Sequence, residues 1–112
     1  MPMLVVYGLP EKGSHEELFH TLKRAVMDVA ELKLGENSVS VKMPRDHVPM
    51  ELGAEIIVMV ECLTAKPDRT EEVRDKLASA IVKTSQSYFP DANLIECFIK
   101  PFERGQGFAS SK

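Results

Sequence analysis

Apolar and polar positions along the chain form two similar series of segments. Met3–Tyr7 is apolar throughout and predicts a strand, which is followed by a loop with the breakers Pro10 and Gly13. Ser14 and Glu17 form the pattern Ser-x-x-Glu, which predicts that a helix begins at Ser14. One face of this helix is marked by apolar residues at three- and four-residue spacing: Leu18, Leu22, Val26, Val29 and Ala30.

A second strand around Val39 and Val41 ends at Pro44, and the same order then repeats. Residues 54–63 contain an uninterrupted apolar run that predicts another strand. The pattern Asp68-x-x-Glu71 predicts the start of a second helix. The apolar face of that helix consists of Val73, Leu77, Ala80, Ile81 and Tyr88.

Residues 94–100 predict the last strand, which we expect to end at Pro101. A strand, a crossover helix and a parallel strand form a β-α-β unit. Two such units predict an α+β fold of order β-α-β-β-α-β, a four-stranded mixed sheet with two helices on one face. We expect a single domain over residues 1–112, with pseudo-repeats 1–46 and 54–108.

Two predicted strands are apolar without alternation, namely residues 3–6 and 56–60. A strand covered on one face alternates apolar and polar residues, so both faces of this sheet require cover. Two helices can cover only one face. The other face then packs against a second copy of the chain, unless the strand is central in a differently layered monomer.

Composition narrows the class of protein. Hydrophobic residues at 44% and charged residues at 28% argue against disorder, and the net charge of −3 does not indicate a nucleic-acid surface. No apolar run reaches the roughly 18 residues of a membrane helix, and the N-terminus lacks the features of a secretory peptide. Cys62 and Cys97 sit in apolar runs, so we expect reduced core thiols in a cytoplasmic protein.

A metal site is not indicated, because the histidines and cysteines show no ligand spacing: His15, His20, His47, Cys62 and Cys97.

Several features together resemble the tautomerase superfamily over about residues 2–108. They are Met1-Pro2 opening directly into a strand, the doubled β-α-β unit, the stop at Pro44 and the tail Gly105-Gln106-Gly107-Phe108. This family includes 4-oxalocrotonate tautomerase-like enzymes, carboxymethyl-hydroxymuconate isomerases and macrophage migration inhibitory factor. Its longer members fold as two β-α-β halves and assemble as trimers, so the resemblance implies a homotrimer.

The resemblance also implies a chemistry without a cofactor. Removal of Met1 leaves Pro2 as a secondary amine, and an α-amino group has an ordinary pKa of roughly 7.7–8.0. In an apolar pocket beside a cation such an amine acts as a base near neutral pH. Pro2 is then the catalytic residue, which moves a proton on a small enolisable keto acid. If Met1 is retained, Pro2 is a tertiary amide and has no basic nitrogen.

By position, the resemblance implies four candidate cations for the substrate carboxylate, all in loops or just ahead of a strand: Lys12, Lys33, Lys66 and Arg69. It also implies that Phe98 of the last strand is a substrate-binding residue of the pocket. Each also has a simpler interpretation, as a solvated loop charge, a helix-end cation favoured by the helix dipole, or a core aromatic. Glu96 shares a face with Phe98 and would repel an anion. Ser40 stands where the short tautomerases have an arginine.

Two function classes remain open. One is a cofactor-independent tautomerase or isomerase; the other is a non-catalytic trimeric binding or structural protein on the same fold. A ferredoxin-like ligand-sensing module is a third, since it shares the element order. A free Pro2 amine with at least two pocket cations favours the enzyme, whereas a blocked Pro2 and an acidic or apolar pocket favour the binding protein.

Overall fold

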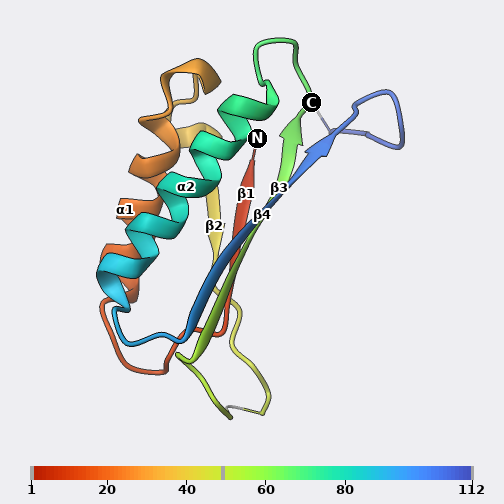
Figure 1. Ribbon diagram of the computed structural model, residues 1–112. Coiled ribbons are helices and arrows are strands. Elements are labelled where there is room, and N and C mark those ends of the chain that lie inside the picture. The colour runs from red at the N-terminus through yellow and green to blue at the C-terminus, as the bar shows by residue number, and fades with distance from the viewer. Residues whose placement is uncertain (1, 49, 112) are drawn as a thin grey trace.

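The computed structural model describes residues 2–48 and 50–111 (Figure 1). The strands are β1 (Met3–Tyr7), β2 (Ser40–Lys42), β3 (Glu55–Thr64) and β4 (Leu94–Phe102). The helices are α1 (His15–Met27) and α2 (Glu71–Tyr88), with short 3-10 helices at Ala30–Leu32 and Glu36–Ser38. Within these ranges no helix has both the length and the apolar character needed to cross a bilayer.

The four strands form one mixed sheet in the order β2-β1-β3-β4. β1 pairs with β2 in parallel, β3 pairs with β4 in parallel, and β1 and β3 run antiparallel in the middle. Figure 1 shows α1 and α2 on the same face of the sheet. The predicted α+β fold of two β-α-β units is therefore confirmed, with the two units side by side in opposite directions.

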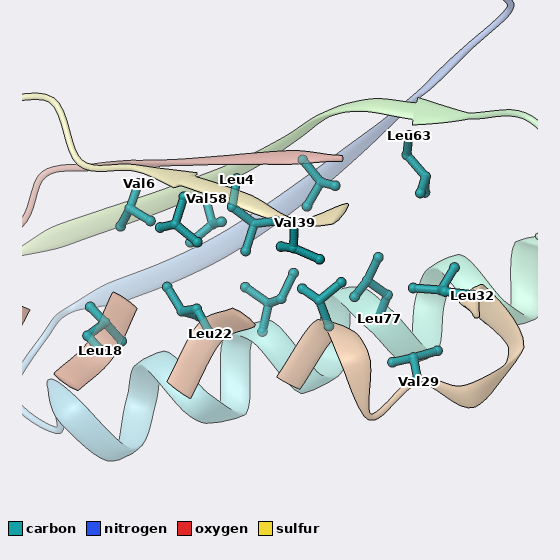
Figure 2. Close-up of a cluster of buried hydrophobic side chains, with 14 of the residues drawn as sticks. Leu4, Val6, Leu18, Leu22, Val29, Leu32, Val39, Val58, Leu63 and Leu77 are labelled. Carbon is teal, nitrogen blue, oxygen red and sulfur yellow. The ribbon is translucent and has the colours of Figure 1, made fainter. Parts of the chain in front are cut away.

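The hydrophobic core lies between the sheet and the two helices. Every second residue of β3 is buried from Ile56 to Val60, because successive side chains of a strand point to opposite faces. Figure 2 shows Val58 on the side of the sheet that faces the helices, with Leu22 of α1 and Leu77 of α2 on the helix side of the same core cluster. The helical periodicity in the sequence therefore identified the faces that pack.

The other face of the sheet, which we call the outer face, carries apolar side chains without cover. Met59 of β3 lies beside Phe98 of β4, and β1 contributes Val5 and Tyr7. Tyr7 is 44% exposed and Phe98 is 48% exposed. The unbroken apolar run of β3 is explained by this arrangement, because both faces of the strand are apolar but only one is covered within the chain.

Both helix starts differ from the predicted capping patterns. The side chain of Ser14 makes no capping hydrogen bond to α1. α2 is capped by Thr70, whose hydroxyl accepts a hydrogen bond from the Val73 amide at 3.3 Å. Asp68 lies too early, because the chain still turns there, with the Arg69 amide donating to the Lys66 carbonyl.

The strands and the first helix also depart from the sequence prediction. Cys62 is exposed rather than buried, because a β-bulge with φ of 62° interrupts β3 and returns Leu63 to the core. β4 continues through Pro101 because it is an edge strand, where a missing amide is tolerated. α1 ends at Met27, and Val29 is buried through the following 3-10 turn.

Candidate active site

Pro2 lies at the head of β1 and is fully buried. Its carbonyl accepts a hydrogen bond from the Ser40 amide at 3.1 Å, which attaches it to the start of β2. Because β1 and β3 are antiparallel, Met3 pairs with Glu61, and Pro2 is at the end of the sheet where β3 finishes. Met1 lies outside the described residues.

Arg69 is a buried cation at this same end of the sheet. Its side chain is packed so that the residue is only 6% exposed. Its guanidinium donates to the carbonyl oxygens of Thr64 at 2.8 Å and Leu32 at 3.3 Å. Among the described residues no carboxylate forms an ion pair with it. Buried charges are normally paired, so Arg69 is a cation with unused capacity for an anion.

An open depression of about 450 Å³ lies against Arg69. Lys66 and Arg104 also line it, and Glu103 is the acidic side chain of the lining. Three basic side chains therefore face one acid. Pro2 does not line the depression, although Ser38 of its wall is only two residues from the Pro2 partner Ser40.

Lys33 lies at the same end of the sheet, but its ammonium is paired with a carboxylate outside the depression. It takes the left-handed conformation, with φ of 54°, directly after the 3-10 turn whose Leu32 carbonyl binds Arg69. Its ammonium lies 3.6 Å from the Asp68 carboxylate, and both side chains are largely exposed. Asp68 is therefore paired with Lys33 and does not neutralise its neighbour Arg69.

The structure does not bring all the predicted site residues together. Pro2, Lys33, Lys66 and Arg69 share one end of the sheet, where β1 begins. Lys12 is exposed in the loop beyond the opposite end of β1. Phe98 lies on the outer face, away from the helices.

Sequence reasoning missed Arg104 and Glu103 as members of this end, since both follow Pro101, where the sequence predicts that the last strand ends. The expected parallel pairing of β3 with β4 is the signal that could have located these two residues. It continues to Thr64 opposite Phe102, and the Ala65 amide donates to the Phe102 carbonyl at 2.8 Å. The residues after β4 therefore lie beside the loop after β3.

Cys97 is not an activated nucleophile. Burial raises the pKa of the Cys97 thiol to about 12, so it is protonated at neutral pH. Across residues 2–48 and 50–111, no group of three His, Cys, Asp or Glu side chains is arranged to hold a metal ion.

No protein-family model and no curated protein matches the sequence. Solved structures do match over nearly the whole chain. A structure described as F6 fused 4-OT wild type asymmetric trimer is 17% identical, with a TM-score of 0.69, over 98% of this chain and 94% of that chain. A macrophage migration inhibitory factor of Toxoplasma gondii is 13% identical, with a TM-score of 0.64, over 99% and 96%.

N1, a member of the cis-3-chloroacrylic acid dehalogenase family, is 11% identical, with a TM-score of 0.70, over 98% of this chain and 81% of that chain. These three proteins are all members of the tautomerase superfamily. The chain has the tautomerase fold. TM-scores of 0.64–0.70 establish that fold, whereas identities of only 11–17% leave the chemistry to be argued from the residues.

Proposed function

We propose that this chain is a cofactor-independent tautomerase or isomerase that acts on a small enolisable keto acid. Pro2, once freed of Met1, is the base, and Arg69 binds the substrate carboxylate. The observation that carries the proposal is that Arg69 is buried without a carboxylate partner at the end of the sheet where Pro2 begins β1.

Pro2 is suited to proton transfer by its position. Removal of Met1 would expose a secondary amine at the head of a buried strand. Burial disfavours the charged form of an amine, and so would the positive charges of Arg69 and Lys66, which lie at the same end of the sheet. Both effects favour a neutral amine that accepts a proton from carbon near neutral pH and returns it to the product.

Arg69 is suited to hold a carboxylate. A guanidinium has five N–H donors in a planar fork, and two hydrogen bonds to protein carbonyls leave donors for a ligand. The bonds to Thr64 and Leu32 also fix its orientation before substrate binds. Lys66 and Arg104 on the walls would stabilise the negative charge that develops on the enolate oxygen.

A homotrimer would complete the site. The outer face is apolar and uncovered within one chain, and the matching fused 4-OT is described as a trimer. One chain keeps Phe98 and Lys12 away from Pro2, so in such an assembly they could act at the Pro2 pocket only from neighbouring copies. Sedimentation equilibrium should give about three times 12.5 kDa.

Phe98→Asp tests the assembly, because it places a charge on the outer face. We expect this variant to be a folded monomer, whereas Ser79→Asp on the exposed side of α2 should remain a trimer. A wild-type monomer at micromolar concentration, or a trimeric Phe98→Asp protein, would contradict this interface.

One observation favours a second candidate, a non-catalytic binding protein on the same fold. Pro2 is fully buried and does not line the depression beside Arg69. A carboxylate could then bind at Arg69 without any contact with a base.

Ketonisation of a phenylenolpyruvate-type enol separates the two candidates. Intact mass first establishes which molecules lack Met1. In such protein, Pro2→Ala keeps a primary amine but should lower the rate about tenfold or more, since general bases contribute about 10²–10⁴-fold. Equal rates for Pro2→Ala and wild type would remove the catalytic role and favour the binding protein.

A further inference from the structure

The C-terminal tail that follows Phe102 leaves the end of β4, loops outward and returns toward it (Figure 1). The reversal begins with a turn in which the Gln106 amide donates to the Glu103 carbonyl at 3.1 Å. Gly107 comes next with φ of +87°, a conformation that glycine adopts readily and other residues rarely do. The tail thereby brings the Phe108 ring back to Phe102, with 5.9 Å between the ring centres.

Phe108 contacts both an aromatic ring and a cation. Its ring meets that of Phe102 at 65°, close to the edge-to-face arrangement that aromatic pairs favour. The guanidinium carbon of Arg104 lies 5.1 Å from the centre of the Phe108 ring. A cation within about 6 Å of a ring centre is attracted by the negative charge of the ring face. Phe108 therefore joins Arg104 to the end of β4.

Arg104 is also a wall residue of the depression beside Arg69. Within the described ranges it forms no ion pair, although Glu103 precedes it directly and lines the same depression. Arginine has a long, flexible stem, and a neighbouring carboxylate can compete for its charge. The ring face attracts the guanidinium without accepting a hydrogen bond from it, so the contact itself leaves the N–H donors of Arg104 for an anion.

We propose that Phe108 is a positioning residue, which holds the Arg104 guanidinium at the wall of the depression and so raises the affinity of the depression for an anion. This role rests on the proposed function, in which Arg69 binds the substrate carboxylate and Arg104 faces the enolate oxygen. Without the ring, the Arg104 side chain would move into solvent or toward Glu103, and the ligand would lose its charge. Phe108 thus acts on the ligand through Arg104.

The contact between Phe108 and Arg104 can be tested without a ligand. The ring current of Phe108 should shift the NMR signals of the Arg104 side-chain protons. The shift should disappear in Phe108→Leu, which keeps an apolar side chain against Phe102, and persist in Phe108→Tyr, which keeps the ring. Equal Arg104 signals in wild type and Phe108→Leu would overturn the positioning role and leave the proposed function untouched.

Titration with pyruvate, a small keto acid, tests the consequence for binding and is followed by amide shifts of residues that line the depression. We expect Phe108→Leu to weaken pyruvate binding about threefold, the size of one exposed cation–π contact, and Phe108→Tyr to bind like wild type. In an Arg104→Met background, Phe108→Leu should have no further effect, because the ring acts only through the guanidinium.

α1 offers a matched control. The Lys23 ammonium lies 5.5 Å from the centre of the Phe19 ring, and neither residue lines the depression. Phe19→Leu removes the same type of contact as Phe108→Leu, so it should leave pyruvate binding unchanged. An equal loss of affinity in Phe19→Leu and Phe108→Leu would overturn the positioning role, because the loss would then not come from the wall of the depression.

The remaining outcomes separate the role of Phe108 from the function on which it rests. Unchanged affinity in Phe108→Leu, or the same loss with and without Arg104, would overturn the positioning role while pyruvate still binds at Arg69. The absence of saturable pyruvate binding to wild type, or binding that Arg69→Met leaves unchanged, would instead contradict the proposed function and the role of Phe108 with it.

Discussion

The two ends of the sheet are built by the same strand–loop–helix arrangement, yet their charges are opposite. At the end where β1 begins, three basic side chains face one acid. At the end where β1 finishes, Glu11 and Asp46 face Arg45 alone. The fold supplies a depression at both ends, and the loop residues decide which ligand chemistry each can accept.

The same residue type also behaves differently at the two ends. Arg69 is 6% exposed and is held by two backbone carbonyls, whereas the Arg45 side chain is 79% exposed and pairs with Glu11. A buried guanidinium is fixed before a ligand arrives, and an exposed one is not. This difference is why we place the anion site at Arg69.

The largest effect that we predict is on stability, from Gly8→Ala at the acidic end. Gly8 has φ of +83°, and a Cβ there would overlap the backbone carbonyl oxygen of Glu55. Neither the backbone conformation nor that carbonyl can adjust without disturbing β3. We expect a loss of about 3 kcal/mol in the free energy of unfolding, measured by urea denaturation.

Gly35→Ala is the matched control at the basic end. Its backbone lacks a positive φ, and a Cβ there would meet no atom within 4 Å. This variant should be neutral or stabilising by up to about 1 kcal/mol, through the lower entropy of the unfolded chain. Equal losses for Gly8→Ala and Gly35→Ala would contradict the tight contact between Gly8 and β3.

Sequence periodicity predicted the element order, the sheet and the uncovered outer face, because these depend on burial patterns within each segment. It did not predict the bulge at Cys62 or the cap at Thr70. Those features depend on how the ends of neighbouring elements meet. A pattern such as Asp68-x-x-Glu71 can therefore lie two residues ahead of the true cap, Thr70.

The second-largest effect that we predict is a difference in stability between variants of Arg69 and Arg45. Arg69→Met leaves the carbonyls of Thr64 and Leu32 without their donor in a buried setting, and we expect a loss of about 2 kcal/mol in stability. Arg45→Met breaks only an exposed ion pair and should cost less than about 0.5 kcal/mol. Urea denaturation of both variants measures the difference.

Ligand binding gives a second comparison of the Arg69→Met and Arg45→Met variants. A keto-acid carboxylate titrated by calorimetry should lose affinity in Arg69→Met and keep it in Arg45→Met. Arg69→Lys keeps the charge without the planar fork, so it should restore only part of the affinity. Full affinity in a folded Arg69→Met protein would remove Arg69 from the proposed site.

The candidate site was only partly predictable for a physical reason. The sequence shows that Lys66 and Arg69 are loop cations, but burial of Arg69 depends on the Leu32 carbonyl, 37 residues away in the chain. The position of Lys12 at the other end of the sheet likewise follows from the antiparallel arrangement of the two units, which no local pattern specifies.

The smallest predicted effect concerns the turn that supports Arg69 at the basic end. The pKa of Glu31 is lowered from its ordinary value of 4.5, chiefly by a hydrogen bond to its own backbone and then by Lys76. The Lys76 ammonium lies 3.2 Å from the Glu31 carboxylate. Lys76→Met should therefore raise the pKa of Glu31 but leave it below 4.5, because the larger cause remains.

The sign of the pH dependence follows from this lowered pKa. A carboxyl group whose pKa falls on folding stabilises the folded state at pH values above 4.5, and that contribution is lost as pH drops through the lower folded value. Glu31 is exposed, so the effect on stability is small, and an NMR titration of its side chain is the sensitive measurement. If Lys76→Met left this titration unchanged, the contact between the Ala30–Leu32 turn and α2 would contribute nothing to the charge of Glu31. The position of the Leu32 carbonyl beside Arg69 would then depend on packing alone.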